Sequence, residues 1–140
     1  MVLIDSGSTH NFIHCKLAKV LNCFVYLAPE FRVMIADGGT INCSWKCYNI
    51  NLSMGEYLLN SPMISIPMGG VDVVLGFQWL QSFGTVDFNF KKKFMKFSWE
   101  GKEYELNGIT GKPSKVIISN GMKKLLKKQK QCVITQLYSL

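Results

Sequence analysis

The tripeptide Asp5-Ser6-Gly7 directly follows the short apolar run of residues 2–4. An aspartate at the end of a buried strand can support hydrolysis when a second carboxyl group lies beside it, because the two groups then share one proton. The ionised carboxylate takes a proton from water, and the protonated group polarises the carbonyl under attack. Gly7 allows a sharp turn behind Asp5, and the Ser6 hydroxyl can fix the loop. The tripeptide alone is more often an ordinary turn, so its context decides between the two interpretations.

The elements around this tripeptide begin with a strand over residues 2–4 and a helix after it. Apolar side chains recur at helical spacing between residues 12 and 21, Ser8 or Thr9 can cap the helix, and Asn22 can end it. We therefore expect the loop that carries Asp5 to connect a strand to a helix.

The middle of the chain has the alternating pattern of β-strands. Residues 31–36 and 40–45 flank Asp37-Gly38-Gly39, which predicts a tight hairpin because glycine adopts positive φ without steric cost. A proline at position 62 marks an edge strand or a bulge. The further strands expected are 50–54, 57–66, 71–75, 86–90, 94–99 and 102–106, and a short helix is expected over 77–83, closed by Gly84. These elements predict a mainly β domain with two short helices.

Four motifs, in order along the chain, resemble those of retropepsin-like aspartic proteases, most closely the proteases of gypsy-class long-terminal-repeat retrotransposons of plants. The first is the active-site strand and its loop, the second a flap hairpin that closes over substrate, the third an apolar strand followed by a glycine and a short helix, and the fourth the closing strands. They lie at residues 3–13, 33–39, 71–80 and 94–102.

The resemblance implies a retropepsin-like fold, in which residues 1–108 form one closed β-barrel half of a homodimer and residues 109–140 a basic connector toward reverse transcriptase. It implies an aspartic endopeptidase that processes a Gag–Pol polyprotein, without a metal or an organic cofactor. By the same resemblance Asp5 is the catalytic carboxylate, and Ser6 and Gly7 hold its loop. The flap residues are Ile35, Ala36, Asp37, Gly38 and Gly39.

Only one Asp-Ser-Gly occurs in the chain, so a mechanism with two carboxyl groups needs a second chain. A symmetric homodimer would place Asp5 and its symmetry mate on the two-fold axis. Relatives carry a hairpin before the active-site strand, whereas Met1 stands four residues before Asp5, and we expect that hairpin to be missing here. The alternative to an enzyme is therefore a catalytically silent, truncated remnant or an interaction module.

The net charge of +7 lies entirely in the tail. Seven lysines and no acidic residue occur within 112–140, whereas residues 1–111 hold nine basic and nine acidic residues. A neutral body argues against a broad nucleic-acid-binding face. The tail could contact RNA, but no aromatic side chains interleave its lysines, which favours a solvated connector. No apolar run approaches the ~18–20 residues of a membrane helix, so we expect no membrane partner and an intracellular, cytoplasmic location, in virus-like particles of the parent element.

A metal site is a weaker hypothesis. His10 and His14 would share a helix face next to Cys15, but no third ligand has a fixed spacing. Cys43 and Cys47 lie in strand-like sequence, too far apart to bind one ion. The odd total of five cysteines, with no export signal, predicts free thiols, most of them in apolar segments where cysteine packs as a small hydrophobic residue.

Overall fold

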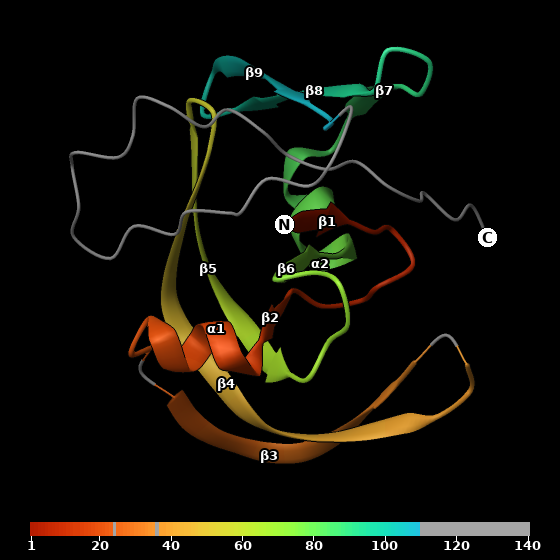
Figure 1. The fold of residues 1–140 in the computed structure, drawn as a ribbon. Helices are drawn as coiled ribbons and strands as arrows, with labels where there is room; N and C mark the ends of the chain where they lie inside the picture. The colour runs from red at the N-terminus through yellow and green to blue at the C-terminus, as the bar shows by residue number, and fades with distance from the viewer. Residues whose placement is uncertain (24, 36, 110–140) are drawn as a thin grey trace.

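The computed structural model describes residues 1–23, 25–35 and 37–109, and their strands form two sheets (Figure 1). The larger sheet contains β1 (Val2–Ile4), β2 (Phe12–His14), β3 (Val25–Met34), β4 (Thr40–Met54), β5 (Tyr57–Ile66) and β6 (Val73–Leu75). The smaller sheet contains β7 (Val86–Asn89), β8 (Phe94–Trp99) and β9 (Lys102–Asn107). The helices are α1 (Cys15–Val20), α2 (Phe77–Leu80) and the 3-10 helix η1 (Gln81–Phe83).

The larger sheet has the strand order β1-β6-β2-β5-β4-β3. β1 runs parallel to β6, and β2 runs antiparallel to β6 but parallel to β5. β6 therefore lies between two strands, and all three of its side chains are buried, as expected for its continuous apolar sequence. The sheet curls, with the long β3–β4 hairpin sweeping away from β5 (Figure 1). This mainly β architecture with two helices confirms the predicted retropepsin-like, half-barrel fold class.

The helix expected over residues 12–21 is wrong in its first turn. Residues Phe12–His14 form β2, and α1 begins only at Cys15, with the His14 side chain accepting a hydrogen bond from the backbone of Lys16. The physical reason is that β2 has a strand on either side, because Phe12 pairs with Val74 of β6 and with Ile64 of β5. Ladder hydrogen bonds on both edges outweigh a local helical periodicity.

The hairpin predicted around residues 37–39 is confirmed as β3–β4, and the strand predicted at 57–66 is confirmed as β5 with the same bounds. Between β4 and β5 the register shifts, so that Cys47 pairs with Met63 but Ile50 pairs with Ser61. Pro62 lies opposite this irregularity, where its missing N–H costs no ladder hydrogen bond. Of the two alternatives predicted from Pro62, an edge strand or a bulge, the structure has the bulge, since β5 lies between β2 and β4.

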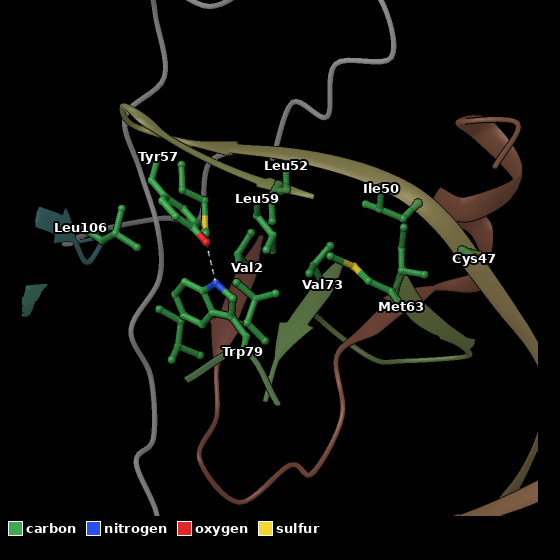
Figure 2. Close-up of a cluster of buried hydrophobic side chains, with 14 of the residues drawn as sticks. Val2, Cys47, Ile50, Leu52, Tyr57, Leu59, Met63, Val73, Trp79 and Leu106 are labelled. Atoms are coloured by element: carbon green, nitrogen blue, oxygen red, sulfur yellow. Dashed lines mark hydrogen bonds between the residues drawn. The ribbon is translucent and has the colours of Figure 1, made fainter. Parts of the chain in front are cut away.

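The main core lies between the larger sheet and the smaller one, whose buried side chains are Met95, Phe97 and Leu106. Trp79 of α2 is 3% exposed and donates its Nε1–H to the Tyr57 hydroxyl at 3.3 Å, which satisfies the one polar atom of the indole (Figure 2). Aromatic rings from α2, η1 and β8 pack around Tyr57 at centroid distances of 5.1 to 6.1 Å. This cluster fixes α2, and with it the end of β6.

The predicted connector, residues 109–140, lies outside the described residues except for position 109. Within the described ranges, no helix is long and apolar enough to cross a membrane.

Candidate active site

Asp5 lies at the end of β1, where the parallel pairing with β6 stops. Ile4 pairs with Leu75, and the Asp5 backbone N–H donates to the Leu75 carbonyl at 3.0 Å. The Ser8 N–H donates to the Asp5 carbonyl at 3.2 Å, which closes a turn directly after the strand. The first of these bonds ties the backbone of Asp5 to β6, and the second holds the turn that follows it.

The Asp5 carboxylate is half-buried and accepts two local hydrogen bonds. The Gly7 N–H donates to Oδ1 at 2.9 Å, and the Ser8 hydroxyl donates to Oδ2 at 2.7 Å. Hydrogen bonds to an ionised carboxylate are shorter and stronger than neutral ones. The carboxylate is therefore held in one orientation by one donor on each oxygen, and it retains lone pairs for a further partner.

The predicted residues Ser6 and Gly7 lie in this same loop. A Cβ at position 7 would lie 3.2 Å from Oδ1 of Asp5, so glycine permits the close approach of the backbone to the carboxylate. The hydroxyl that contacts the carboxylate belongs to Ser8, to which the sequence interpretation assigned only a possible capping role. The sequence feature that indicates this contact is the three-residue spacing between Asp5 and Ser8, which is typical of local side-chain hydrogen bonds.

The loop of residues 5–10 packs on the junction between β6 and α2. Gly76 occupies that junction, and a Cβ there would lie 2.4 Å from the His10 carbonyl oxygen and 2.5 Å from that of Ser8. The N–H of Phe77 donates to the Ser8 carbonyl at 2.7 Å. Gly76, which follows the apolar strand predicted at residues 71–75, therefore allows the Asp5 loop to pack closely on the β6–α2 junction. No side chain larger than hydrogen fits at this position.

The predicted flap residues lie together at the tip of the β3–β4 hairpin, apart from Ala36, which lies outside the described residues. The Gly38 N–H donates to the Ile35 carbonyl at 2.9 Å, and the Asp37 carboxylate accepts from the Gly39 N–H at 2.8 Å. Gly38 has a φ of 85°, a conformation that favours glycine. β1 and β3 are opposite edges of the sheet, yet the tip and the loop after β1 lie on the same side of the view in Figure 1.

The three other aspartates of the chain lie elsewhere. Asp37 is in the hairpin tip, and Asp87 is exposed on β7 in the smaller sheet. Asp72 binds the amino group of Met1 at the beginning of the β1–β6 pair, whereas Asp5 lies at its end. Among the four aspartates of the chain, only Asp5 directly follows a strand that pairs with the buried strand β6.

The histidines do not share a helix face, contrary to the expectation behind the metal hypothesis. His10 lies in the loop before β2, and His14 caps α1. Among residues 1–23, 25–35 and 37–109, no three histidine, cysteine or acidic side chains gather closely enough to bind a metal. Cys43 and Cys47 are buried as free thiols, and burial raises the pKa of both, that of Cys47 to about 11.

Comparison with known protein families places these features in one family's range of the chain. The family model described as retroviral aspartyl protease matches residues 1–102, a range that includes the Asp5 loop, the β3–β4 hairpin and Gly76. No curated protein matches the chain.

Proposed function

Because the chain belongs to the retroviral aspartyl protease family, we propose that it is an aspartic endopeptidase in which Asp5 activates water for attack on a peptide bond. The observation that carries this proposal is the Asp5 carboxylate itself. It is held by Gly7 and Ser8 at the end of a strand paired to buried β6, in a loop seated on Gly76. A carboxylate fixed in this way needs no reorganisation when it accepts a proton.

The reaction requires a second carboxyl group, and the other aspartates of the chain lie in other elements. We propose that a homodimer supplies it, with Asp5 of each chain facing its copy across the two-fold axis. The ionised carboxylate takes a proton from water, and the water oxygen bonds to the scissile carbonyl carbon. The other carboxyl group gives its proton to the carbonyl oxygen. The carboxyl group that took the proton from water then gives it to the amide nitrogen, and the other carboxylate takes a proton back from one hydroxyl of the tetrahedral intermediate. The C–N bond breaks, an acid and an amine leave, and the pair of carboxyl groups again holds one proton.

The natural substrate proposed is the Gag–Pol polyprotein of a gypsy-class retrotransposon, processed where that polyprotein assembles. The support is the order of the four motifs along residues 3–102 and the lysine-rich segment after them, which resembles a connector to reverse transcriptase. In this proposal the hairpin tip at Ile35 and Asp37–Gly39 covers the bound peptide.

The test compares wild type, Asp5→Asn and Asp87→Asn on a peptide library between pH 4 and 7. Asparagine preserves the shape of the side chain but cannot share a proton. Asp87 is exposed on β7 of the smaller sheet and provides the matched control. We expect cleavage by wild type and Asp87→Asn and at least a 1,000-fold loss in Asp5→Asn, about the scale set by loss of a catalytic group. Equal cleavage by all three proteins would refute the assignment, and a folded but inactive wild type would favour the silent remnant.

A further inference from the structure

Apart from the aromatic Tyr57 and Trp79, Asn11 is the one side chain with a nitrogen or oxygen atom that the described part of the chain buries, at 2% exposure. It follows the loop that carries Asp5 and directly precedes β2. A buried amide is costly unless its donors and its acceptor are paired. The partners of Asn11 therefore show what this side chain connects.

The amide of Asn11 joins two segments that are distant in sequence. Its Oδ1 accepts from the Gly76 N–H at 2.9 Å, and its Nδ2 donates to the Ser61 hydroxyl oxygen at 3.1 Å. The Ser61 hydroxyl in turn donates to the Pro62 carbonyl at 3.1 Å. One side chain thus ties the end of the Asp5 loop to the β6–α2 junction on one side and to β5 on the other.

The hydrogen bond between Asn11 and Gly76 is the one that acts on the loop carrying Asp5. The carbonyls of Ser8 and His10 already lie against the α-carbon of Gly76, and the Gln78 N–H donates to the Thr9 carbonyl at 3.2 Å. These contacts hold the middle of the loop, while Asn11 holds its end through the Gly76 N–H. Without that hydrogen bond the Gly76 N–H is left buried and unpaired, and the loop can separate from the junction.

We propose that Asn11 is a positioning residue for the reaction, whose amide sets the distance between the Asp5 loop and the β6–α2 junction and so the direction of the Asp5 carboxylate. This inference rests on the proposed function. The chemistry favours an amide because it presents an acceptor to Gly76 and, at the same reach, a donor to Ser61. A displacement of about 1 Å at a reacting group is enough to lower a rate by roughly 100-fold, so a hydrogen bond at the end of the loop can act on the rate without touching substrate.

The test compares four variants with wild type at pH 5. Asn11→Leu removes both hydrogen bonds at similar volume, and Asn11→Asp restores an acceptor for Gly76, with a donor when the buried carboxyl is protonated. Ser61→Ala removes only the partner of Nδ2. Met95→Val is the structural control, because it thins the core from the side of the smaller sheet, whose strands do not pair with β1, β2 or β6. The readouts are kcat and KM on one peptide, the thermal midpoint, and the exchange rate of the Gly76 amide proton by NMR.

We expect Asn11→Leu to lower kcat at least tenfold with KM within twofold, and to speed exchange at Gly76 at least tenfold. Asn11→Asp should keep at least a third of the wild-type kcat, and Met95→Val should lower the midpoint but not kcat. The inference is wrong if Asn11→Leu keeps the wild-type kcat. It is also wrong if Met95→Val, at a thermal midpoint equal to that of Asn11→Leu, loses as much kcat as Asn11→Leu does. Ser61→Ala leaves the Gly76 hydrogen bond in place and should keep kcat within about threefold. If Asn11→Leu does not fold, Asn11→Ser takes its place, because its shorter side chain cannot reach both partners, and an unchanged kcat and Gly76 exchange rate there overturn the inference.

An inactive wild type would overturn the proposed function rather than the contact. In that case the exchange measurement still decides the role of Asn11 in holding the loop. Exchange at Gly76 that is no faster in Asn11→Leu than in wild type would overturn it.

Discussion

Replacing Gly76 with alanine should displace the Asp5 loop. The added Cβ would lie 2.4 Å from the His10 carbonyl oxygen, 2.5 Å from the Ser8 carbonyl oxygen and 3.0 Å from the His10 carbonyl carbon. All three are backbone atoms, so no side-chain rotation relieves the overlap. Restoring ordinary contact, which starts near 3.4 Å, requires a movement of roughly 1 Å in a close-packed region.

The magnitude follows from that displacement. Overpacking of this kind costs about 1–3 kcal/mol of the free energy of unfolding, and each kcal/mol lowers the thermal midpoint of a domain of this size by about 4–8 °C. A shift of about 1 Å at a reacting carboxylate lowers the rate by roughly 100-fold. We therefore expect Gly76→Ala to lose both stability and most activity.

The assay is a thermal melt followed by circular dichroism, together with initial cleavage rates measured well below the midpoint. Gly69→Ala is the matched control, because no atom lies within 4 Å of its added Cβ and its φ is not in the left-handed region. Gly69→Ala should melt within about 2 °C of wild type, since a substitution in open space usually changes stability by less than 0.5 kcal/mol. If Gly76→Ala melts and cleaves like Gly69→Ala, the proposed packing of the loop on Gly76 is wrong.

Three further changes test other parts of the structure. Ser8→Ala removes the 2.7 Å hydrogen bond to the Asp5 carboxylate and should lower kcat/KM by about 10- to 150-fold, since such a bond is worth about 1.5–3 kcal/mol; unchanged peptide cleavage would contradict this. Tyr57→Phe leaves the buried Nε1–H of Trp79 without its acceptor and should cost about 1–3 kcal/mol in urea unfolding. Burial raises the pKa of Cys47 from 9.0 to about 11; because the unfolded thiol ionises first, stability should fall as pH rises from 9 through 11, and a midpoint equally pH-dependent in Cys47→Ala would exclude this cause.

Much of the fold follows from local patterns in the sequence. β5 alternates buried and exposed side chains at its first positions, Tyr57 to Asn60, which is the pattern of a strand with one face in the core. The β3–β4 hairpin follows from its glycine turn, and the end of η1 from Gly84, which has a φ of 72°. In these elements the local preference and the tertiary environment agree.

The features that sequence patterns did not predict depend on contacts between distant segments. Phe12 lies in a strand because β5 and β6 both pair with it, although its spacing from later apolar residues is helical. Trp45 of β4 remains 51% exposed, although its size and apolar character would favour burial. The role of Asn11 requires knowing that Gly76 and Ser61 approach it, and neither spacing nor residue type indicates those partners.

The central claim is that two Asp5 carboxyl groups, one from each of two chains, form one site. The most direct measurement mixes wild type with Asp5→Asn at constant total chain concentration, above the dissociation constant of the dimer, and follows peptide cleavage against the mutant fraction. If both carboxyl groups are required and chains assort at random, activity falls with the square of the wild-type fraction, so an equal mixture retains about one quarter of the wild-type rate. A linear fall, to about one half in the equal mixture, would show that each chain acts alone and would contradict the shared site.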